Sequence, residues 1–258
     1  MKVFTSKKVL TVIALVCACF TAHAQESLTV KTEAGKLATH IPEAKKYQIT
    51  DLKVTGEING TDILLLRQMA GKGLKEDDRT EGKLSSLDLS EVRIVEEGEN
   101  YCAIKQGLLT KFYKPTEKDA IPPYMFYRLN QLTKIQLPAS IKKIDKFALT
   151  GCTTLVECAI PEKVTSIGDY AFASCEKLTT MTFPSALGEI GAHVFEGCSA
   201  LTTLSEFPQT LTDIGENAFY KTAVTAFSVS EESEDYAAVD GVLYNKPMTR
   251  QELRNYID

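Results

Sequence analysis

The stretch Leu132-Thr-Lys-Ile-Gln-Leu-Pro138 decides the fold, because close copies of it follow at a fixed distance. It returns 23 residues later as Leu155-Val-Glu-Cys-Ala-Ile-Pro161, and again as Leu178-Thr-Thr-Met-Thr-Phe-Pro184. A second phrase follows each copy at the same period, at Ile144–Leu149, Ile167–Phe172 and Ile190–Phe195. Self-similarity at a fixed period of this length indicates a stacked solenoid. A solenoid presents an extended surface, so binding is the first function to consider.

The first phrase of each repeat predicts a short strand with one buried side. Behind each leading leucine, apolar residues recur three and five positions on, and the last two of these columns have the two-residue spacing of a strand. The proline that closes the phrase cannot donate a ladder hydrogen bond, so it ends the strand. The repeat length and the leucine columns together predict an α/β repeat solenoid of the leucine-rich type, with 23-residue coils and a parallel β-strand face.

The second phrase predicts a turn followed by a buried ring. Gly168, Gly191 and Gly215, with Asp145 in one coil, follow the isoleucine column, and both residue types suit a turn with unusual backbone angles. We expect the small-plus-aromatic pair that comes next to lie on a short helical turn. Each ring should then stack on its copy in the neighbouring coil, in the column Leu149, Phe172, Phe195, Phe219.

The first 24 residues are predicted to be a signal peptide. Lysines precede an uncharged, largely apolar run of 12 residues, Val9–Phe20, and Ala22-His23-Ala24 has the small-x-small pattern of a cleavage site. The run is too short to span a bilayer core, which needs about 20 residues. A lipoprotein signal ending at Cys19 is the alternative. We expect an exported protein, secreted or at the cell surface, with the periplasm as an alternative location.

The charge of the mature chain argues against anionic partners as a class. Removing Lys2, Lys7 and Lys8 leaves 26 basic against 34 acidic side chains, a net charge of −8. Nucleic-acid binders carry basic patches, and anionic lipid attracts basic segments, so neither partner is expected. An acidic balance of this size favours solubility outside the cytoplasm.

The repeat pattern and its interruptions divide the chain. The segment 25–83 has other patterning and reads as an N-terminal α/β cap with a strand around Ile49–Val54, a turn at Glu57–Gly60 and one helix. We expect Thr61 or Asp62 to be the N-cap of that helix and Gly71 to end it. Residues 84–223 hold the leucine-rich repeats, with an irregular insert at 91–120, and 224–258 form a C-terminal cap, because terminal coils must be covered.

The phrase Ile-Gly-Asp-Tyr-Ala-Phe-x-x-Cys, intact at Ile167–Cys175, resembles the BspA-like leucine-rich repeat of bacterial surface proteins. Ile58–Asp62 is similar to that family's leading segment, Ser86–Ser90 to its first coil, and Asp240–Asn245 to its closing hairpin. The resemblance implies an exported, non-enzymatic protein used for adhesion or protein contact, with no catalytic residue to carry over. The sequence departs from the family pattern at Lys246–Arg250, which puts the completeness of the C-terminal cap in doubt.

No residue pattern points to catalysis, to a metal or to a cofactor. The cysteine column Cys152, Cys175, Cys198 stacks along one line, whereas zinc needs four converging ligands. The spacing of stacked coils would allow a disulfide, but parallel Cβ vectors disfavour it, so buried free thiols are expected and a disulfide is the alternative. Outside the leader only His40 and His193 are histidines, and neither lies in a Ser–His–Asp pattern.

The exposed strand positions and the insert are the candidate contact surface. Its predicted residues are Lys134, Gln136, Glu157, Thr180, Thr182 and Thr203 on the strands, with Tyr101, Phe112 and Tyr113 in the insert. About five coils at ~4.8 Å by four residues at ~3.3 Å give only about 300–350 Å². A standard interface buries about 800 Å² per partner, so the insert must extend the strand face, or contacts must be multivalent, or the ligand small.

These observations give two hypotheses. The leading one is a non-enzymatic, adhesin-like protein that contacts an extracellular or envelope protein, or a glycan, through the strand face and the insert. The alternative is a structural component of the envelope that stacks on another chain through its solenoid end. The sequence leaves the oligomeric state open, with a monomer as the expectation.

Overall fold

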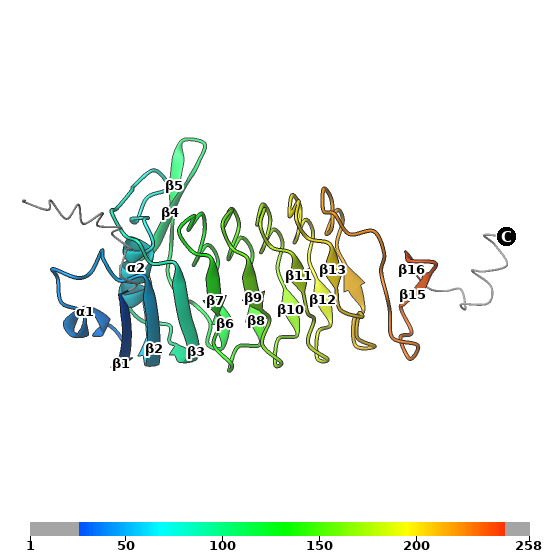
Figure 1. Ribbon diagram of the computed structural model, residues 1–258, viewed down its shortest axis with the longest axis horizontal. Helices are drawn as coiled ribbons and strands as arrows, with labels where there is room; N and C mark the ends of the chain where they lie inside the picture. Colours follow the sequence, from blue (N-terminus) through cyan, green and yellow to red (C-terminus); the bar gives the residue numbers. More distant parts are fainter. Residues whose placement is uncertain (1–25, 246–258) are drawn as a thin grey trace, which may run out of the picture.

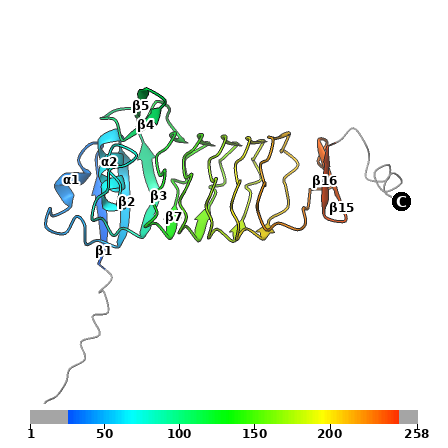
Figure 2. The ribbon, with the colours of Figure 1, turned by 90° about the horizontal axis from the view of Figure 1, so that it is seen from above.

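The computed structural model describes residues 26–245 and has the form of a solenoid with its coils in a row. The coils follow one another from an N-terminal cap to a C-terminal hairpin, and the same row is visible from above (Figures 1 and 2). The predicted signal peptide with Cys19, and the segment Lys246–Arg250, lie outside the described residues. One apolar core runs from Val30 in the cap to Tyr236 in the hairpin.

Two parallel sheets line the solenoid. The first has the order β1-β2-β3-β7-β9 and the second the order β14-β12-β10-β8-β6. The strands of the first sheet are β1 (Ser27–Thr32), β2 (Asp51–Ile58), β3 (Ser86–Ile94), β7 (Lys134–Gln136) and β9 (Glu157–Ala159), and the pair β11 (Thr180–Met181) and β13 (Thr203–Leu204) follows them. The strands of the second sheet are β6 (Ala120–Ile121), β8 (Lys143–Ile144), β10 (Ser166–Ile167), β12 (Glu189–Ile190) and β14 (Asp213–Ile214).

The strand registers follow the 23-residue period. Ile135 lies opposite Cys158, and Ile144 lies opposite Ile167, each pair 23 residues apart. The inward residues are buried, and polar neighbours on the same strands face out. The predicted α/β repeat solenoid with a parallel strand face is confirmed.

The turn after each second-sheet strand differs from the prediction in two ways. Residues 146–151 form consecutive turns rather than a helix, because two residues per coil, four positions apart, have a left-handed backbone that a helix excludes. The first of the two is Tyr124, Phe147, Tyr170, His193 or Asn217, with φ between 55° and 62°. Gly168 and Gly215 do not have left-handed backbone angles; they are needed because a side chain would collide with the neighbouring coil. A Cβ on Gly215 would lie 2.3 Å from the Ala192 nitrogen, and one on Gly168 would lie 2.7 Å from the Lys146 nitrogen.

The N-terminal cap holds the two helices, α1 (Leu37–His40) and α2 (Gly60–Met69). The N-cap of α2 is Asn59 rather than Thr61 or Asp62. The Asn59 side chain accepts a hydrogen bond from the Thr61 N–H, and the Asp62 carboxylate accepts one from the Asn59 N–H. The buried Asp62 carboxylate also accepts from the Gly35 and Leu37 N–H groups at 2.6 and 3.0 Å, which ties α1 to α2. Strand β2 runs to Ile58, so no turn fills Glu57–Gly60, and Gly71 has φ +90° just after α2, as predicted.

Side chains of the cap and the insert close the N-terminal end of the coil stack. Along the turn edge each coil donates N–H groups to the carbonyls of the next coil, as Phe126 N does to Ala148 O at 2.8 Å. The first coil has no such donor before it. The buried Arg67 guanidinium donates instead to the carbonyls of Tyr124, Met125 and Tyr127 at 3.1, 3.2 and 3.5 Å. The Tyr101 hydroxyl donates to the Pro123 carbonyl at 2.6 Å.

Within residues 26–245 the C-terminal end of the coil stack is closed only in part. The antiparallel hairpin of β15 (Tyr236–Val239) and β16 (Val242–Asn245) follows the last coil, and the Tyr236 hydroxyl accepts from the Ile214 N–H at 2.9 Å. In this part of the chain the last N–H groups of the turn edge, on Asn217, Phe219 and Lys221, have no hydrogen-bond acceptor.

Candidate functional site

The structure brings the six predicted strand residues onto one face. Lys134 lies opposite Glu157 across β7 and β9, and Thr180 lies opposite Thr203 across β11 and β13. Glu157, Thr180, Thr182, Thr203 and Gln136 are exposed, and Lys134 is half-buried. The neighbouring strands extend the face toward the cap through Lys53 and Asp88.

Cross-strand ion pairs neutralise the charged half of this face. Lys134 lies 3.0 Å from Glu157, and Lys53 lies 2.5 Å from Glu91 and 3.6 Å from Asp88. The hydrogen bond to Glu91 raises the pKa of Lys53. Burial alone would raise the pKa of Asp88, but hydrogen bonds from Ser90 and the charge of Lys53 outweigh it and lower the pKa. The face is therefore charged yet balanced near the cap and carries neutral threonine hydroxyls further along.

A hollow of about 400 Å³ opens at the ends of β7 and β9. The buried side chains of Leu137 and Ile160 and the small side chains of Ala139 and Ala159 give it an apolar lining, and Gln136 stands at its edge. An apolar side chain of a partner would fit here, so the strand face offers one apolar hollow beside its polar residues.

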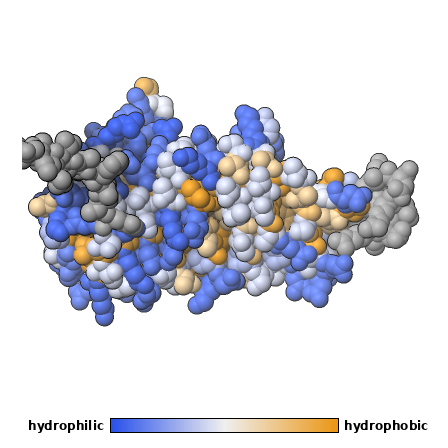
Figure 3. Space-filling view, in the orientation of Figure 1, coloured by the Kyte–Doolittle hydropathy of each residue, from blue (hydrophilic) through white to orange (hydrophobic). Residues whose placement is uncertain are grey.

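The insert is a hairpin rather than an irregular loop. Strand β3 continues to Ile94, and β4 (Cys102–Gln106) then pairs antiparallel with β5 (Leu109–Tyr113) around Gly107. The hairpin projects from the row of coils (Figure 1), and its tip is an apolar spot in Figure 3. The exposed apolar side chains of the hairpin are Leu108 at 102%, Leu109 at 77% and Phe112 at 51%.

Two of the three predicted insert aromatics do not lie on the surface. Tyr101 is fully buried, with its hydroxyl on Pro123, and Tyr113 is 8% exposed with its ring 4.5 Å from that of Tyr124. Both rings hold the hairpin to the solenoid, so only Phe112 is available to a ligand. Sequence reasoning missed Leu108 and Leu109, although Gly107 between two alternating runs is a hairpin signal.

A second hollow, of about 350 Å³, lies between the hairpin and the first coils. We call it the lysine pocket; it is lined by Asn100, Lys111, Phe112, Tyr113, Lys114, Thr116, Pro123 and Lys146. Three lysines and no carboxylate line it. None of the three forms an ion pair within residues 26–245, and Lys111 lies 5.5 Å from the centre of the Tyr113 ring.

A stack of rings runs along the turn edge from this pocket. Tyr124, Phe147, Tyr170 and His193 lie nearly parallel, with successive ring centroids 4.9, 5.0 and 4.6 Å apart. His193 ends the stack half-buried, with Nδ1 2.9 Å from Glu196. The 23-residue period and the shared left-handed backbone place these rings face to face, so His193 belongs to a packing column.

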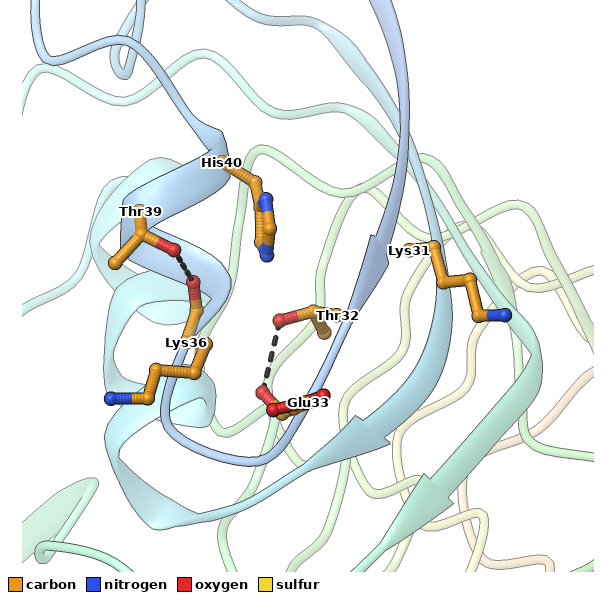
Figure 4. Close-up of a pocket in the computed structure, with 6 residues that line it drawn as sticks. All are labelled: Lys31, Thr32, Glu33, Lys36, Thr39 and His40. Carbon is orange, nitrogen blue, oxygen red and sulfur yellow. Dashed lines mark hydrogen bonds between the residues drawn. The ribbon is translucent and has the colours of Figure 1, made fainter.

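A hollow of about 470 Å³ in the cap is lined by Lys31, Thr32, Glu33, Lys36, Thr39 and His40. Figure 4 shows that the ammonium groups of Lys31 and Lys36 point away from its centre. The threonine hydroxyls are used locally, since Thr32 donates to the Glu33 carbonyl at 3.0 Å and Thr39 to the Lys36 carbonyl at 2.7 Å. The cations of this hollow therefore do not converge.

The described cysteines are buried free thiols, as the packing argument predicts. Cys152 and Cys198 donate to the carbonyls of Phe126 and Phe172 at 3.0 and 3.1 Å, and burial raises the pKa of Cys152 to about 12. Across residues 26–245 no cluster of three His, Cys, Asp or Glu side chains could hold a metal ion. No helix in that range has the length and apolarity to cross a membrane.

Comparison with known proteins gives the repeats a family. The family described as BspA type leucine rich repeat region matches residues 119–237 in six copies. Among solved structures, a leucine rich repeat protein of T. pallidum is 30% identical over 42% of this chain and 50% of that chain, with a TM-score of 0.40. The pneumococcal vaccine antigen PcpA is 26% identical over 45% and 35%, with a TM-score of 0.38.

A leucine-rich repeat protein from Eubacterium ventriosum is 28% identical over 49% of this chain and 39% of that chain, with a TM-score of 0.38. These matches span half or less of the solved chains. No curated protein matches this chain. The repeats in residues 119–237 are thus leucine-rich repeats of the BspA type.

Proposed function

We propose that this protein is a non-enzymatic binding protein of the bacterial exterior, with an adhesin-like role. Its contact surface consists of the strand face and the β4–β5 hairpin, and its ligand is an extracellular or envelope protein or a glycan. The predicted signal peptide supports export to the surface or beyond. The leucine-rich repeats support binding, because such solenoids present extended surfaces.

The observation that carries this proposal is the projecting hairpin. Leu108 and Leu109 are almost entirely exposed at its tip, and Phe112 is half exposed beside the lysine pocket. A soluble monomer gains nothing from large apolar side chains held out on a rigid ribbon, and exposed apolar patches mark interaction sites. The hairpin also adds area to a strand face that is too small for a protein partner by itself.

A binding panel tests the proposal. Mature protein would be titrated against matrix proteins, envelope proteins and glycans, in parallel with the double variant Leu108→Ser/Leu109→Ser. Neither side chain packs in the core, so the variant keeps its stability while it loses a protein partner that uses the tip. The matched control is Val242→Ser, which changes an exposed apolar residue on the C-terminal hairpin. A panel without any ligand, or a variant that binds every ligand unchanged, contradicts the proposal.

The open turn edge favours a second candidate, an assembly role through the solenoid end. The N–H groups of Asn217, Phe219 and Lys221, which have no acceptor among the described residues, repeat those of His193, Phe195 and Gly197, which donate to the next coil at 2.8–2.9 Å. If two copies met at their C-terminal ends, the N–H donors of one copy would face the N–H donors of the other. If the C-terminal end of one copy met the N-terminal end of another, these N–H groups would face first-coil carbonyls. Those carbonyls already accept hydrogen bonds from Arg67 and Tyr101. A carbonyl-bearing segment of a different protein therefore suits this edge better than a second copy.

Light scattering after size exclusion distinguishes these cases. A monomer at high concentration agrees with the edge argument, whereas a concentration-dependent polymer would show that copies do stack through their ends.

A further inference from the structure

We propose that the lysine pocket binds an acidic saccharide, a sugar chain that carries carboxylates. This inference rests on the proposed binding function and names a ligand class for part of the same surface. The pocket lies where β5 meets the turns of the first coils, so rigid elements position its groups: Lys111, Phe112 and Tyr113 come from the hairpin and Lys146 comes from a coil.

The charge of the pocket calls for an anion. Lys111, Lys114 and Lys146 line one hollow, although the protein is acidic overall. By contrast, Lys53, Lys134 and Lys143 each lie within 3.0 Å of a carboxylate. The three pocket lysines lack such a partner in the described chain. Like charges gathered without counter-charges repel one another, so an anionic ligand gains affinity by relieving that repulsion.

The size and the neutral lining favour a sugar over a bare ion. A volume of about 350 Å³ is roughly ten times the ~30 Å³ share of one water molecule and lies in the range of small-molecule pockets. Phe112 offers a half-exposed ring on which an apolar sugar face can lie. Asn100 and Thr116 supply neutral donors and acceptors for hydroxyl groups.

The kind of cation favours carboxylates over phosphates. No arginine lines the pocket, and arginine is the residue suited to bidentate phosphate recognition, whereas lysine acts as a point charge. Three separate ammonium groups fit carboxylates spread along a chain of uronic acid units. The acidic balance of the whole protein disfavours nucleic acid and anionic lipid, which present long runs of negative charge.

Calorimetric titration of the mature protein tests the inference. The probes are a galacturonic acid trisaccharide, the neutral galactose trisaccharide, a triglutamate peptide and inorganic phosphate. The uronate should bind, and the other three should bind at least tenfold more weakly. Lys111→Gln, Lys114→Gln and Lys146→Gln should each weaken uronate binding about tenfold, because each removes a charge-assisted hydrogen bond. Phe112→Ala should weaken it as well.

Lys177→Gln is the matched control, since Lys177 is exposed on a coil outside the pocket, and it should bind uronate as the parent does. Equal binding of the neutral sugar, the peptide or phosphate overturns the saccharide assignment. Uronate binding that survives all three lysine substitutions overturns the site. The hairpin-tip variant separates the two proposals: if it loses a panel ligand while uronate binds nowhere, the binding function stands and this inference fails.

Discussion

Arg67 is a buried cation without a carboxylate partner among the described residues, and its place in the fold explains why it is tolerated. It is 1% exposed, and burial lowers its pKa. Its Nη1 donates to three carbonyls of the first coil, while its Nε has no partner in the described chain. A guanidinium presents several donors in a fixed fork, so one side chain can replace the N–H groups that a preceding coil would supply.

Loss of this contact should destabilise the protein. Arg67→Met keeps much of the volume but leaves buried carbonyls without a donor, and we expect the free energy of unfolding to fall by about 2–3 kcal/mol. Tyr101→Phe, which frees the Pro123 carbonyl, should cost about 1 kcal/mol. Urea denaturation measures both. The control Arg93→Met removes a surface pair with Glu57 and should change stability by less than about 1 kcal/mol. An Arg67→Met variant as stable as the parent would show that the carbonyls need no protein donor.

The buried thiols predict alkaline destabilisation. Burial raises the pKa values of Cys102 and Cys158, and it raises that of Cys152 to about 12, whereas an unfolded thiol has a pKa of about 8.5. The unfolded chain therefore loses thiol protons first as pH rises. Stability should be unaffected by these groups below about pH 8.5 and should fall toward pH 12 by up to about 1.4 kcal/mol per pH unit for each thiol.

Denaturation curves between pH 7 and 10.5 check this expectation. Cys152→Ala should lower the free energy of unfolding at pH 7, because it leaves a cavity. At alkaline pH, however, the free energy of unfolding should fall less steeply with pH than in the parent, because one thiol no longer contributes. A slope that is identical in the variant would mean that Cys152 ionises as easily in the folded protein as in the unfolded chain. Thiol reagents should react with the described cysteines only after unfolding, because the thiolate is the reactive form.

At the scale of single elements, the aromatic column carries the packing between coils. The Phe172 and Phe195 ring centroids are 5.5 Å apart, those of Phe195 and Phe219 are 5.4 Å apart, and Phe172 and Phe195 are fully buried. Phe172→Ala should cost about 3–5 kcal/mol, since it leaves a cavity between two coils. Phe112→Ala removes the same side chain from an exposed strand and should cost less than about 1 kcal/mol. Thermal unfolding compares them, and equal losses would contradict the burial argument.

The first strand of each coil was predictable, because the columns that follow Leu132 are seen several times at one spacing. The second-sheet strands at Ile144 and its copies were not predicted, and of the elements that occur once, α2 and β2 were. Nothing in the period predicts β1, which pairs with β2 only through cap contacts, or the β4–β5 hairpin. The helical turn was wrong because the sequence does not reveal that Tyr170 and His193 take left-handed angles, a strain that stacking between coils overcomes.

The candidate site divides in the same way. Alternation along each strand predicts the exposure of Thr180 and Thr203, since neighbouring side chains point to opposite sides. The burial of Tyr101 depends on a carbonyl in the first coil, and Lys111 and Lys146 line one hollow because the hairpin lies against the first coils. Contacts between segments this far apart in the sequence come from tertiary packing, which leaves no local pattern.

At the scale of the whole molecule, core burial weakens toward the C-terminal end. Met181, Ile190 and Phe195 are buried, but the residues in the same columns of the next coil, Leu204, Ile214 and Phe219, are partly exposed. At the other end the cap supplies long parallel strands, two helices and the Arg67 contact. Because each coil contacts only its neighbours, stability in a solenoid is close to a sum of local terms. The two ends should therefore differ in stability.

Amide hydrogen exchange followed by mass spectrometry should show this gradient. We expect the slowest exchange in β2 and β3, faster exchange through β12, and the fastest in β14 and the last coil. Leu211→Ala, which truncates a buried side chain near the C-terminal end, should speed exchange in residues 200–245 and leave the cap unchanged. Leu52→Ala, its counterpart in β2, should speed exchange across the cap and the first coils. If both variants sped exchange equally along the whole chain, the protein would unfold as one cooperative unit, and its stability would not be a sum of local terms.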